Sequence, residues 1–496
     1  MKNASAAYEY HDRTKHRPHR YAPSLGYMDW ATQPDPFRTY PECARIGLAH
    51  DNTTPPFHLL FAAGMLSRAP LCLESLSGLL RYSLGLAAIK RHGGSEWSLR
   101  CNASSGNLHP SECYVVSPPL EGVSEKCTLS HYASRDHALE IVHTYDAPVI
   151  EGGFLILLSS AMWREMWKYG ERSWRYCQLD AGHAYASIKT AATMLGWECS
   201  IVPSDTADLA RRFGLDQLER FHPQERESPD LLIRIAQPRH SLPYPPPLAR
   251  ANRLSPSHHR WDAVWEIDEA ALGPYPQPEP LNRVRRCPAP SKSAGEVILK
   301  RRSAQAMDGS SVTETQFRQI LDASFFCTEA PDVDFIVFVH RVEGIESGLY
   351  AYVRDPSRLP QLRDAMDPDF DWLEAGEGLY RLNRGDYRGA AQYLSCNQTI
   401  ARDAAFSFGM LCRFDAVLAE SGVPGYKNLY HQCGMIGQML YLEATSLGLS
   451  ATGIGCFLDD EFHTLLGLSG TPYQSLYHFT VGRAIVDTRI ATLMPY

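Results

Sequence analysis

The chain is 496 residues long, which is more than one ordinary hydrophobic core holds, so we expect two or three domains. Apolar residues make up 44% and charged residues 21%, which is the composition of a globular protein. The net charge of -8 gives no basic surface for nucleic acid, and the most apolar stretch, residues 153–162, is too short for a membrane span. We therefore expect neither nucleic acid nor a membrane as a partner.

The cysteines bear on the cellular compartment and on metal binding. There are 13 of them, spaced too widely for a CxxC motif, which fits neither a disulfide framework nor a zinc site. The N-terminal sequence MKNASAAYEYHDRTKHRPH has no apolar core of the kind that a secretory signal needs. We expect reduced thiols in the cytoplasm and no metal.

The first distinctive segment is WSLRCNASSGNLHPSECYVV, residues 97–116. It sets Ser104, Ser105 and Asn107 just ahead of an apolar run that predicts a strand. Small hydrogen-bonding residues in this position are typical of a loop that holds a polar group. We therefore expect a ligand-binding loop at residues 104–107.

Two segments resemble each other both in sequence and in the elements that come after them. LDAGHAYASIKTAATMLGW, residues 179–197, and HQCGMIGQMLYLEATSLGL, residues 431–449, both predict helices ended by a glycine. Each precedes a short polar helix that ends in Gly-Leu, and then a strand. The shared order predicts an internal repeat, whose simplest origin is a fused dimer.

A proline-rich segment separates the two copies. Residues 238–290 include YPPPLAR and GPYPQPEP, a composition that favours extended chain and excludes long helices. We expect an N-terminal domain over residues 1–237, a linker over 238–290 and a C-terminal domain over 291–496.

The two copies differ where a ligand would bind. Only the C-terminal copy has RRS at residues 301–303 and VGR at residues 481–483, groups that suit a phosphate, although a solvated basic turn is the alternative. It also has GIG at residues 453–455, which we expect in a loop whose backbone N–H groups face a flat ring. Only the N-terminal copy has the 104–107 loop. We therefore expect one site per chain, built from both copies.

Together, the motifs RRS, GIG, VGR and SSGNLHP resemble those of the flavin-dependent nitroreductase superfamily, in which two protomers share each FMN across a dimer interface. The chain resembles a tandem, single-chain member over nearly its whole length. It is most similar to the SagB/McbC-type azoline dehydrogenase branch, which oxidises thiazolines and oxazolines in modified peptides.

The resemblance implies the residues that bind FMN. For the phosphate and the ribityl chain, these are Arg301, Arg302, Ser303, Gln305 and Gly482, with Arg483 or Arg489 as the C-terminal phosphate contact. For flavin N5 they are Gly455 and its neighbours Ile454 and Cys456. The other copy is expected to contribute Ser104, Ser105 and Asn107. One departure is Ala103, where the family usually has proline.

The segment MWKYGERSWRYCQLDAGH resembles the lysine–tyrosine motif of the azoline dehydrogenases through Lys168 and Tyr169. The resemblance implies that this pair removes a proton from the ring carbon. A lysine partly removed from water has a lowered pKa and can act as a base. The alternative is that Lys168 and Tyr169 cap a helix, while the charged residues after them form a structural ion-pair network.

We predict an α+β fold of two nitroreductase-like domains, each a central antiparallel sheet flanked by helices, that form an intramolecular pseudo-dimer. The implied function is an FMN-dependent oxidoreductase with one FMN per chain, a dehydrogenase or oxidase that passes hydride from a peptide-derived or heterocyclic substrate to flavin N5. Two alternatives stay open: an NAD(P)H-dependent nitro or quinone reductase, and a flavin-binding component of a modification complex without turnover. The chain is expected to be either a monomeric pseudo-dimer or a homodimer.

Overall fold

The computed structural model describes residues 4–50, 53–62, 64–283, 285, 292–486, 488 and 490–496. The chain forms two compact units. Unit 1 consists of Met1–Pro23, Pro276–Pro288 and Arg301–Asp487, and unit 2 of Ser24–Tyr275, Ala289–Lys300 and Thr488–Tyr496. Each unit therefore draws short segments from distant parts of the chain, while the domain boundaries at residues 237 and 291 stay a prediction.

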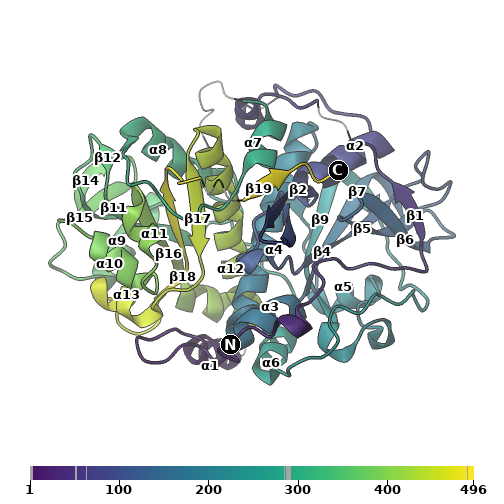
Figure 1. Ribbon diagram of the computed structural model, residues 1–496, viewed down its shortest axis with the longest axis horizontal. Helices are drawn as coiled ribbons and strands as arrows, with labels where there is room; N and C mark the ends of the chain where they lie inside the picture. Colours follow the sequence, from purple (N-terminus) through teal and green to yellow (C-terminus); the bar gives the residue numbers. More distant parts are fainter. Residues whose placement is uncertain are drawn as a thin grey trace. The chain divides into compact units, whose positions relative to one another are not determined.

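Unit 2 is built around an antiparallel sheet of seven strands in the order β1-β6-β5-β4-β7-β9-β8 (Figure 1). Strand β7, between β4 and β9, contains the run FLILL, whose side chains are buried on both faces of the sheet. A smaller sheet has the order β19-β2-β3. The bounds are β1 (Ala44–Gly47), β2 (Leu86–His92), β3 (Ser95–Arg100), β4 (Ser111–Ser117), β5 (Thr128–Ala133), β6 (Ala138–Thr144), β7 (Ile150–Ala161), β8 (Cys199–Ile201), β9 (Glu227–His240) and β19 (Ala491–Leu493).

Unit 1 also has an antiparallel sheet of seven strands, in the order β14-β15-β13-β11-β16-β18-β17. Two short strands pair in parallel beside it. The bounds are β10 (Val312–Thr313), β11 (Val333–Val339), β12 (Val342–Glu343), β13 (Gly348–Tyr352), β14 (Leu373–Gly376), β15 (Leu379–Arg384), β16 (Phe406–Arg413), β17 (Ser450–Ile454) and β18 (Tyr473–Gly482).

Six strands of the two large sheets correspond in order, and the outer edge strands differ, because β1 precedes β4 in the chain whereas β14 lies between β13 and β15. In each, the edge strand after the long helix (β8 or β17) pairs with the last large strand (β9 or β18), which pairs in turn with the strand before that helix (β7 or β16). The long helices are α4 (Ser173–Met194) and α12 (Phe414–Ser446). The common topology confirms the predicted repeat and the α+β fold with antiparallel sheets.

The ends of the long helices follow the prediction, but their beginnings do not. Gly196 after α4 and Gly448 after α12 both have left-handed backbone, with φ of 63° and 71°. Both helices begin earlier than the segments that the sequence suggested. Within α12, Gly422 (φ 63°) and the nearby Pro424 separate two helical parts. The left-handed backbone of Gly422 and the ring of Pro424 are both incompatible with a continuous helix.

The remaining helices are shorter and lie around the sheets or at their edges (Figure 1). None of the described helices combines the length and apolar character that a membrane crossing requires. Their bounds are α1 (Ser5–Arg13), α2 (Leu73–Ser83), α3 (Trp163–Tyr169), α5 (Thr206–Arg212), α6 (Asp262–Ala270), α7 (Ala294–Lys300), α8 (Glu314–Asp322), α9 (Leu359–Ala365), α10 (Arg388–Leu394), α11 (Thr399–Asp403) and α13 (Asp459–Leu465).

Two local expectations need correction. Gly453 and Ile454 lie in strand β17 rather than in a loop, because their backbone pairs with β18, and only Gly455 comes after the strand. The proline-rich segment is not wholly extended chain. Strand β9 continues to His240, and α6 lies in a stretch of it without prolines.

The paired glycines after the long helices give a matched test of the fold. A Cβ on Gly196 would lie 2.6 Å from the Ser67 carbonyl oxygen, whereas a Cβ on Gly448 would meet nothing within 4 Å. Gly448→Ala should therefore lower the free energy of unfolding by only about 1–2 kcal/mol, the cost of left-handed backbone. Gly196→Ala should cost clearly more. Urea denaturation of both variants measures the difference, and equal losses would contradict the close contact at Ser67.

Candidate functional site

The 104–107 loop in unit 2 is a tight turn between β3 and β4 with unusual backbone. Gly106, Asn107 and His109 all have positive φ, at 57°, 60° and 53°. The side chain of Asn107 donates to the Ser98 carbonyl oxygen at 2.8 Å, and the His109 amide donates to Ser104 Oγ at 2.8 Å. These polar side chains therefore hold the turn itself, and the two residues other than glycine are kept in a conformation that is unfavourable on its own.

A buried carboxyl group connects this loop to the long helix. Asp180 on α4 accepts hydrogen bonds from the backbone amide of Ser105 at 3.0 Å and from Ser105 Oγ at 2.9 Å. Burial raises the pKa of Asp180 to about 7, against the opposing effect of the hydrogen bonds from Ser104 and Ser105. Sequence reasoning did not identify Asp180, although an acidic residue within a mostly apolar repeat helix was the available signal.

The predicted catalytic pair lies against the same loop. Lys168 and Tyr169 are the last two residues of α3. A Cβ on Gly106 would lie 2.5 Å from the Tyr169 hydroxyl and 2.9 Å from Lys168 Nζ, so the missing side chain of Gly106 leaves the space that these groups occupy. Lys168 Nζ lies 5.2 Å from the centroid of the Tyr169 ring. The fold thus brings together two motifs that are about 60 residues apart in the sequence.

A second buried carboxyl group belongs to the same cluster. Glu165 is fully buried on α3, and neither of its carboxyl oxygens has a hydrogen-bond partner among the described residues. Burial, and then the charge of Asp180, raise the pKa of Glu165 well above its ordinary value, while Lys168 opposes the shift. The raised pKa favours the neutral acid form of Glu165, which lies one helical turn before Lys168.

Two buried arginines fix the chain as it leaves the loop. Arg164 Nη1 donates to the His109 carbonyl oxygen at 2.8 Å, and Arg100 Nη1 donates to the Ser111 carbonyl oxygen at 3.0 Å. Glu112 accepts a short bond from Arg164 and pairs with His131 Nε2 at 3.0 Å. Although burial acts in the opposite direction, the Arg164 guanidinium holds the pKa of Glu112 well below its usual range. Arg100 therefore joins the residues before and after the loop, and Arg164 holds its exit.

In unit 1, three segments that carry predicted FMN-binding residues meet. The Ala304 amide donates to the Ala451 carbonyl oxygen at 3.0 Å, which joins the RRS segment to β17. The Asp308 amide donates to the Arg483 carbonyl oxygen at 3.0 Å, and the Ile485 amide donates to the Ala306 carbonyl oxygen at 3.0 Å. Residues 301–308 thus run between β17 and the end of β18.

Tyr441 on α12 connects two of these segments and was missed in the sequence. Its hydroxyl accepts from the Gly453 amide at 2.7 Å and shares a hydrogen bond with Ser303 Oγ at 2.9 Å. The guanidinium of Arg301 lies 5.3 Å from the centroid of its ring, and Arg301 is buried. Comparing the two copies of the repeat could have singled out Tyr441, because the N-terminal copy has Lys189 at the equivalent position, 252 residues earlier.

The other predicted residues of unit 1 differ in exposure. Ser303, Gln305 and Arg483 are exposed, while Arg302, Gly455 and Cys456 are half-buried and Ile454 is buried. Gly482 is explained by packing, since a Cβ there would lie 3.1 Å from the Ala405 amide nitrogen. Arg489 lies outside the described residues.

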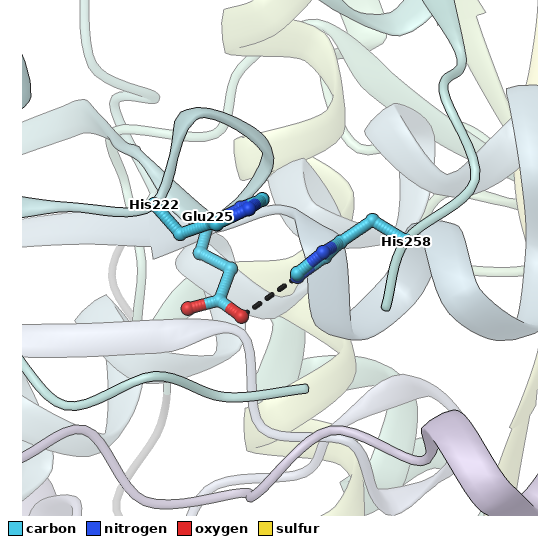
Figure 2. Close-up of side chains that lie close together, drawn as sticks. All are labelled: His222, Glu225 and His258. Carbon is cyan, nitrogen blue, oxygen red and sulfur yellow. Dashed lines mark hydrogen bonds and ion pairs between the residues drawn. The ribbon is translucent and has the colours of Figure 1, made fainter. Parts of the chain in front are cut away.

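One further cluster in unit 2 has the residue types of a metal site. His222, Glu225 and His258 each offer a ligand atom within 4.8 Å of the others (Figure 2). However, the two imidazole rings are stacked at 4.1 Å and 15°, so their planes meet only far from the rings and a single ion near both cannot lie in both planes. The carboxylate of Glu225 also accepts from the amides of Leu254 and Ser255 at 2.8 and 2.9 Å, and from His258 Nε2 at 2.7 Å. The cluster is better explained as a hydrogen-bonded support for His258.

Residues 298–483 match the model of the nitroreductase family. A protein of Methanocaldococcus jannaschii, provisionally named a nitroreductase, is 24% identical over 202 residues, which is 38% of this chain and 90% of that protein. A crystal structure from Anabaena variabilis, provisionally described as a nitroreductase, superposes with a TM-score of 0.71 and 21% identity over 97% of this chain and 99% of that chain. The fold is therefore shared over almost the entire chain.

A weaker match is the E. coli microcin synthetase McbBCD complex with truncated pro-MccB17 bound. It covers 47% of this chain and 92% of that chain, with a TM-score of 0.29 and 17% identity. A likeness this low does not distinguish branches of the superfamily. The family match applies to residues 298–483, and the likeness to the Anabaena variabilis structure shows a common fold.

Asp180 should give the stability of the protein a measurable pH dependence. An aspartate in the unfolded chain has a pKa near 3.9, whereas that of Asp180 in the folded protein is about 7. The folded state keeps the proton of Asp180 to higher pH than the unfolded chain does. Asp180 therefore contributes to the free energy of unfolding at low pH, and this contribution is lost as pH rises from about 4 to about 7. One pKa unit corresponds to about 1.4 kcal/mol, so the total is a few kcal/mol.

Asp180→Asn should remove that contribution, which urea denaturation between pH 5 and pH 8 would detect as a flatter profile than that of the natural chain. Asp216→Asn, at an exposed position of unit 2, is the matched control and should leave the slope unchanged. An unchanged slope in the Asp180 variant would contradict the raised pKa.

Proposed function

We propose that this chain is an FMN-dependent oxidoreductase that acts as a dehydrogenase or oxidase on a peptide-derived or heterocyclic, azoline-like substrate, with one FMN per chain. The observation that most supports the proposal is the contact of Lys168 and Tyr169 with the 104–107 loop at Gly106. It puts the predicted proton acceptor beside the predicted flavin-contacting loop. The family match over residues 298–483 supports the oxidoreductase class.

The residues where three segments of unit 1 meet suit the phosphate and ribityl chain of FMN. Arg302 and Arg483 offer guanidinium groups, and Ser303 and Gln305 offer a hydroxyl and an amide, all at least partly open to solvent. Guanidinium forks match phosphate oxygens in geometry and charge. We assign Arg302 and Arg483 to the phosphate. Arg301, which is buried against Tyr441, then stabilises this segment from behind.

When bound, FMN supplies the hydride acceptor at N5. In the proposed reaction one ring carbon of the substrate gives the hydride, and Lys168 Nζ accepts the proton from the carbon next to it. The Tyr169 hydroxyl, against the same glycine, orients the substrate. The raised pKa of Glu165 favours its neutral form, which limits the negative charge beside Lys168.

The phosphate assignment can be tested by flavin content. Arg302→Ala and Arg483→Ala each remove a charged hydrogen-bond donor, which is worth about 1.5–3 kcal/mol, so FMN affinity should fall roughly tenfold or more. Equilibrium dialysis with FMN measures the change. Arg388→Ala, an exposed arginine of unit 1 paired with Asp386, is the control and should bind normally. Full flavin binding in both variants would remove the assignment.

The direction of electron flow is tested by anaerobic reduction. With a synthetic thiazoline peptide, the flavin should bleach in the natural chain, and Lys168→Ala should slow bleaching by roughly 10²–10⁴-fold, the usual contribution of a general base, without loss of FMN. NADH or NADPH should bleach it slowly or not at all. Rapid bleaching by either nicotinamide would favour the nitro or quinone reductase instead, and bound FMN that neither reagent reduces would favour the binding protein.

A further inference from the structure

A cavity of about 190 Å³ opens in unit 2 beside helix α3, away from the groups assigned above. Ligand pockets for whole cofactors or drug-sized molecules are roughly 300–1,000 Å³, so this cavity is too small for FMN and suits a single side chain. Its walls come from residues 25–32, from α3 and from residues 257–261.

Aromatic rings dominate the walls, and most are fixed in place. Trp163 and Trp167 lie four residues apart on one face of α3. The Trp163 indole N–H donates to Ser255 Oγ at 2.7 Å, and that of Trp167 donates to the Asp29 carbonyl oxygen at 3.0 Å. His258 packs on Trp163 at 4.7 Å and is held from behind by Glu225, as Figure 2 shows. The cavity is therefore preformed rather than dependent on a rearrangement.

The opening is also aromatic. Tyr27, which lines the cavity, and Trp30, whose ring contacts Trp167 at 5.6 Å, are each 67% exposed. Large aromatic side chains at the surface around a hollow are typical of recognition sites. Trp261 adds a further indole ring to the wall, and aromatic rings attract cations.

The charges at the cavity are one-sided. Asp29 supplies the carboxylate among the described lining residues, which include no lysine or arginine. No hydrogen bond or ion pair joins this carboxylate to another described residue. His258 adds no positive charge near neutral pH, because burial lowers its pKa and outweighs the effect of Glu225. Aromatic faces and an unpaired carboxylate together attract a cation.

We propose that this cavity binds the guanidinium group of an arginine side chain in a peptide. A planar cation can stack on the indole faces and pair with Asp29 at the same time, which a compact ammonium group does less well. The inference goes beyond the proposed function, since it requires neither FMN nor turnover. If that function also holds, the shared helix α3 places a peptide anchor on the same element as Lys168.

The test is calorimetric titration of the full chain, with and without added FMN. The probes are the peptides acetyl-Gly-Arg-Gly-amide, its lysine counterpart and its citrulline counterpart, in which a neutral urea replaces the guanidinium. The arginine peptide should bind at least tenfold more tightly than either of the others. Asp29→Asn should remove that preference, and Trp261→Phe should weaken binding of the arginine peptide severalfold.

Asp216→Asn is the matched control, because it makes the same chemical change at an exposed site outside the cavity wall. It should bind like the natural chain, and circular dichroism should show that all three variants are folded. Equal affinities for arginine and citrulline, tighter binding of lysine, no measurable heat, or an unchanged preference in Asp29→Asn would each overturn the proposal. Because binding is measured without FMN, failure of the flavin assignment would leave this result intact.

Discussion

The hydrogen bonds between Asp180 and Ser105 are the interaction on which the site in unit 2 depends. They attach a loop with left-handed backbone to the long repeat helix, and they do so with a carboxyl group that burial makes reluctant to ionise. The same helix end supports α3, which carries Glu165, Lys168 and Tyr169. One buried group thus couples the position of the loop to the electrostatics of the candidate base.

The repeated fold supplies a common scaffold, and single residues make the copies different. Six of the seven strands in each sheet follow the same order, and both long helices end at a left-handed glycine. At equivalent helix positions, however, Tyr441 ties the RRS segment to β17, whereas the N-terminal copy has Lys189. A protonated lysine cannot accept a hydrogen bond from a backbone amide, so the N-terminal copy cannot form the contact that Tyr441 makes.

Sequence patterns predicted what depends on local rules. Glycine-ended helices and the repeat order follow from end signals and are present. The antiparallel α+β class was implied by the resemblance to nitroreductases, and it is present too. The assignment of Gly453 and Ile454 to a loop was wrong, because edge pairing with β18 depends on residues that lie far along the chain. The sequence offered a signal for Asp180 and for Tyr441, but the roles of these residues and of Glu165 could not be predicted for the same reason. Their roles arise from burial and from contacts between segments that tertiary folding brings together.

The way the units share the chain has a practical consequence for dissecting the protein. The last residues belong to unit 2, where β19 pairs with β2 and the Tyr496 hydroxyl donates to the Ser134 carbonyl oxygen at 2.6 Å, while residues before Pro23 belong to unit 1. Expressing the two halves from separate genes, divided in the proline-rich segment, would strip each of a strand or helix that only the other fragment carries. Such fragments could regain the missing strand or helix only when they are mixed and associate. Because the C-terminal residues pack within unit 2, a bulky fusion partner is better placed in an exposed loop than at the C-terminus.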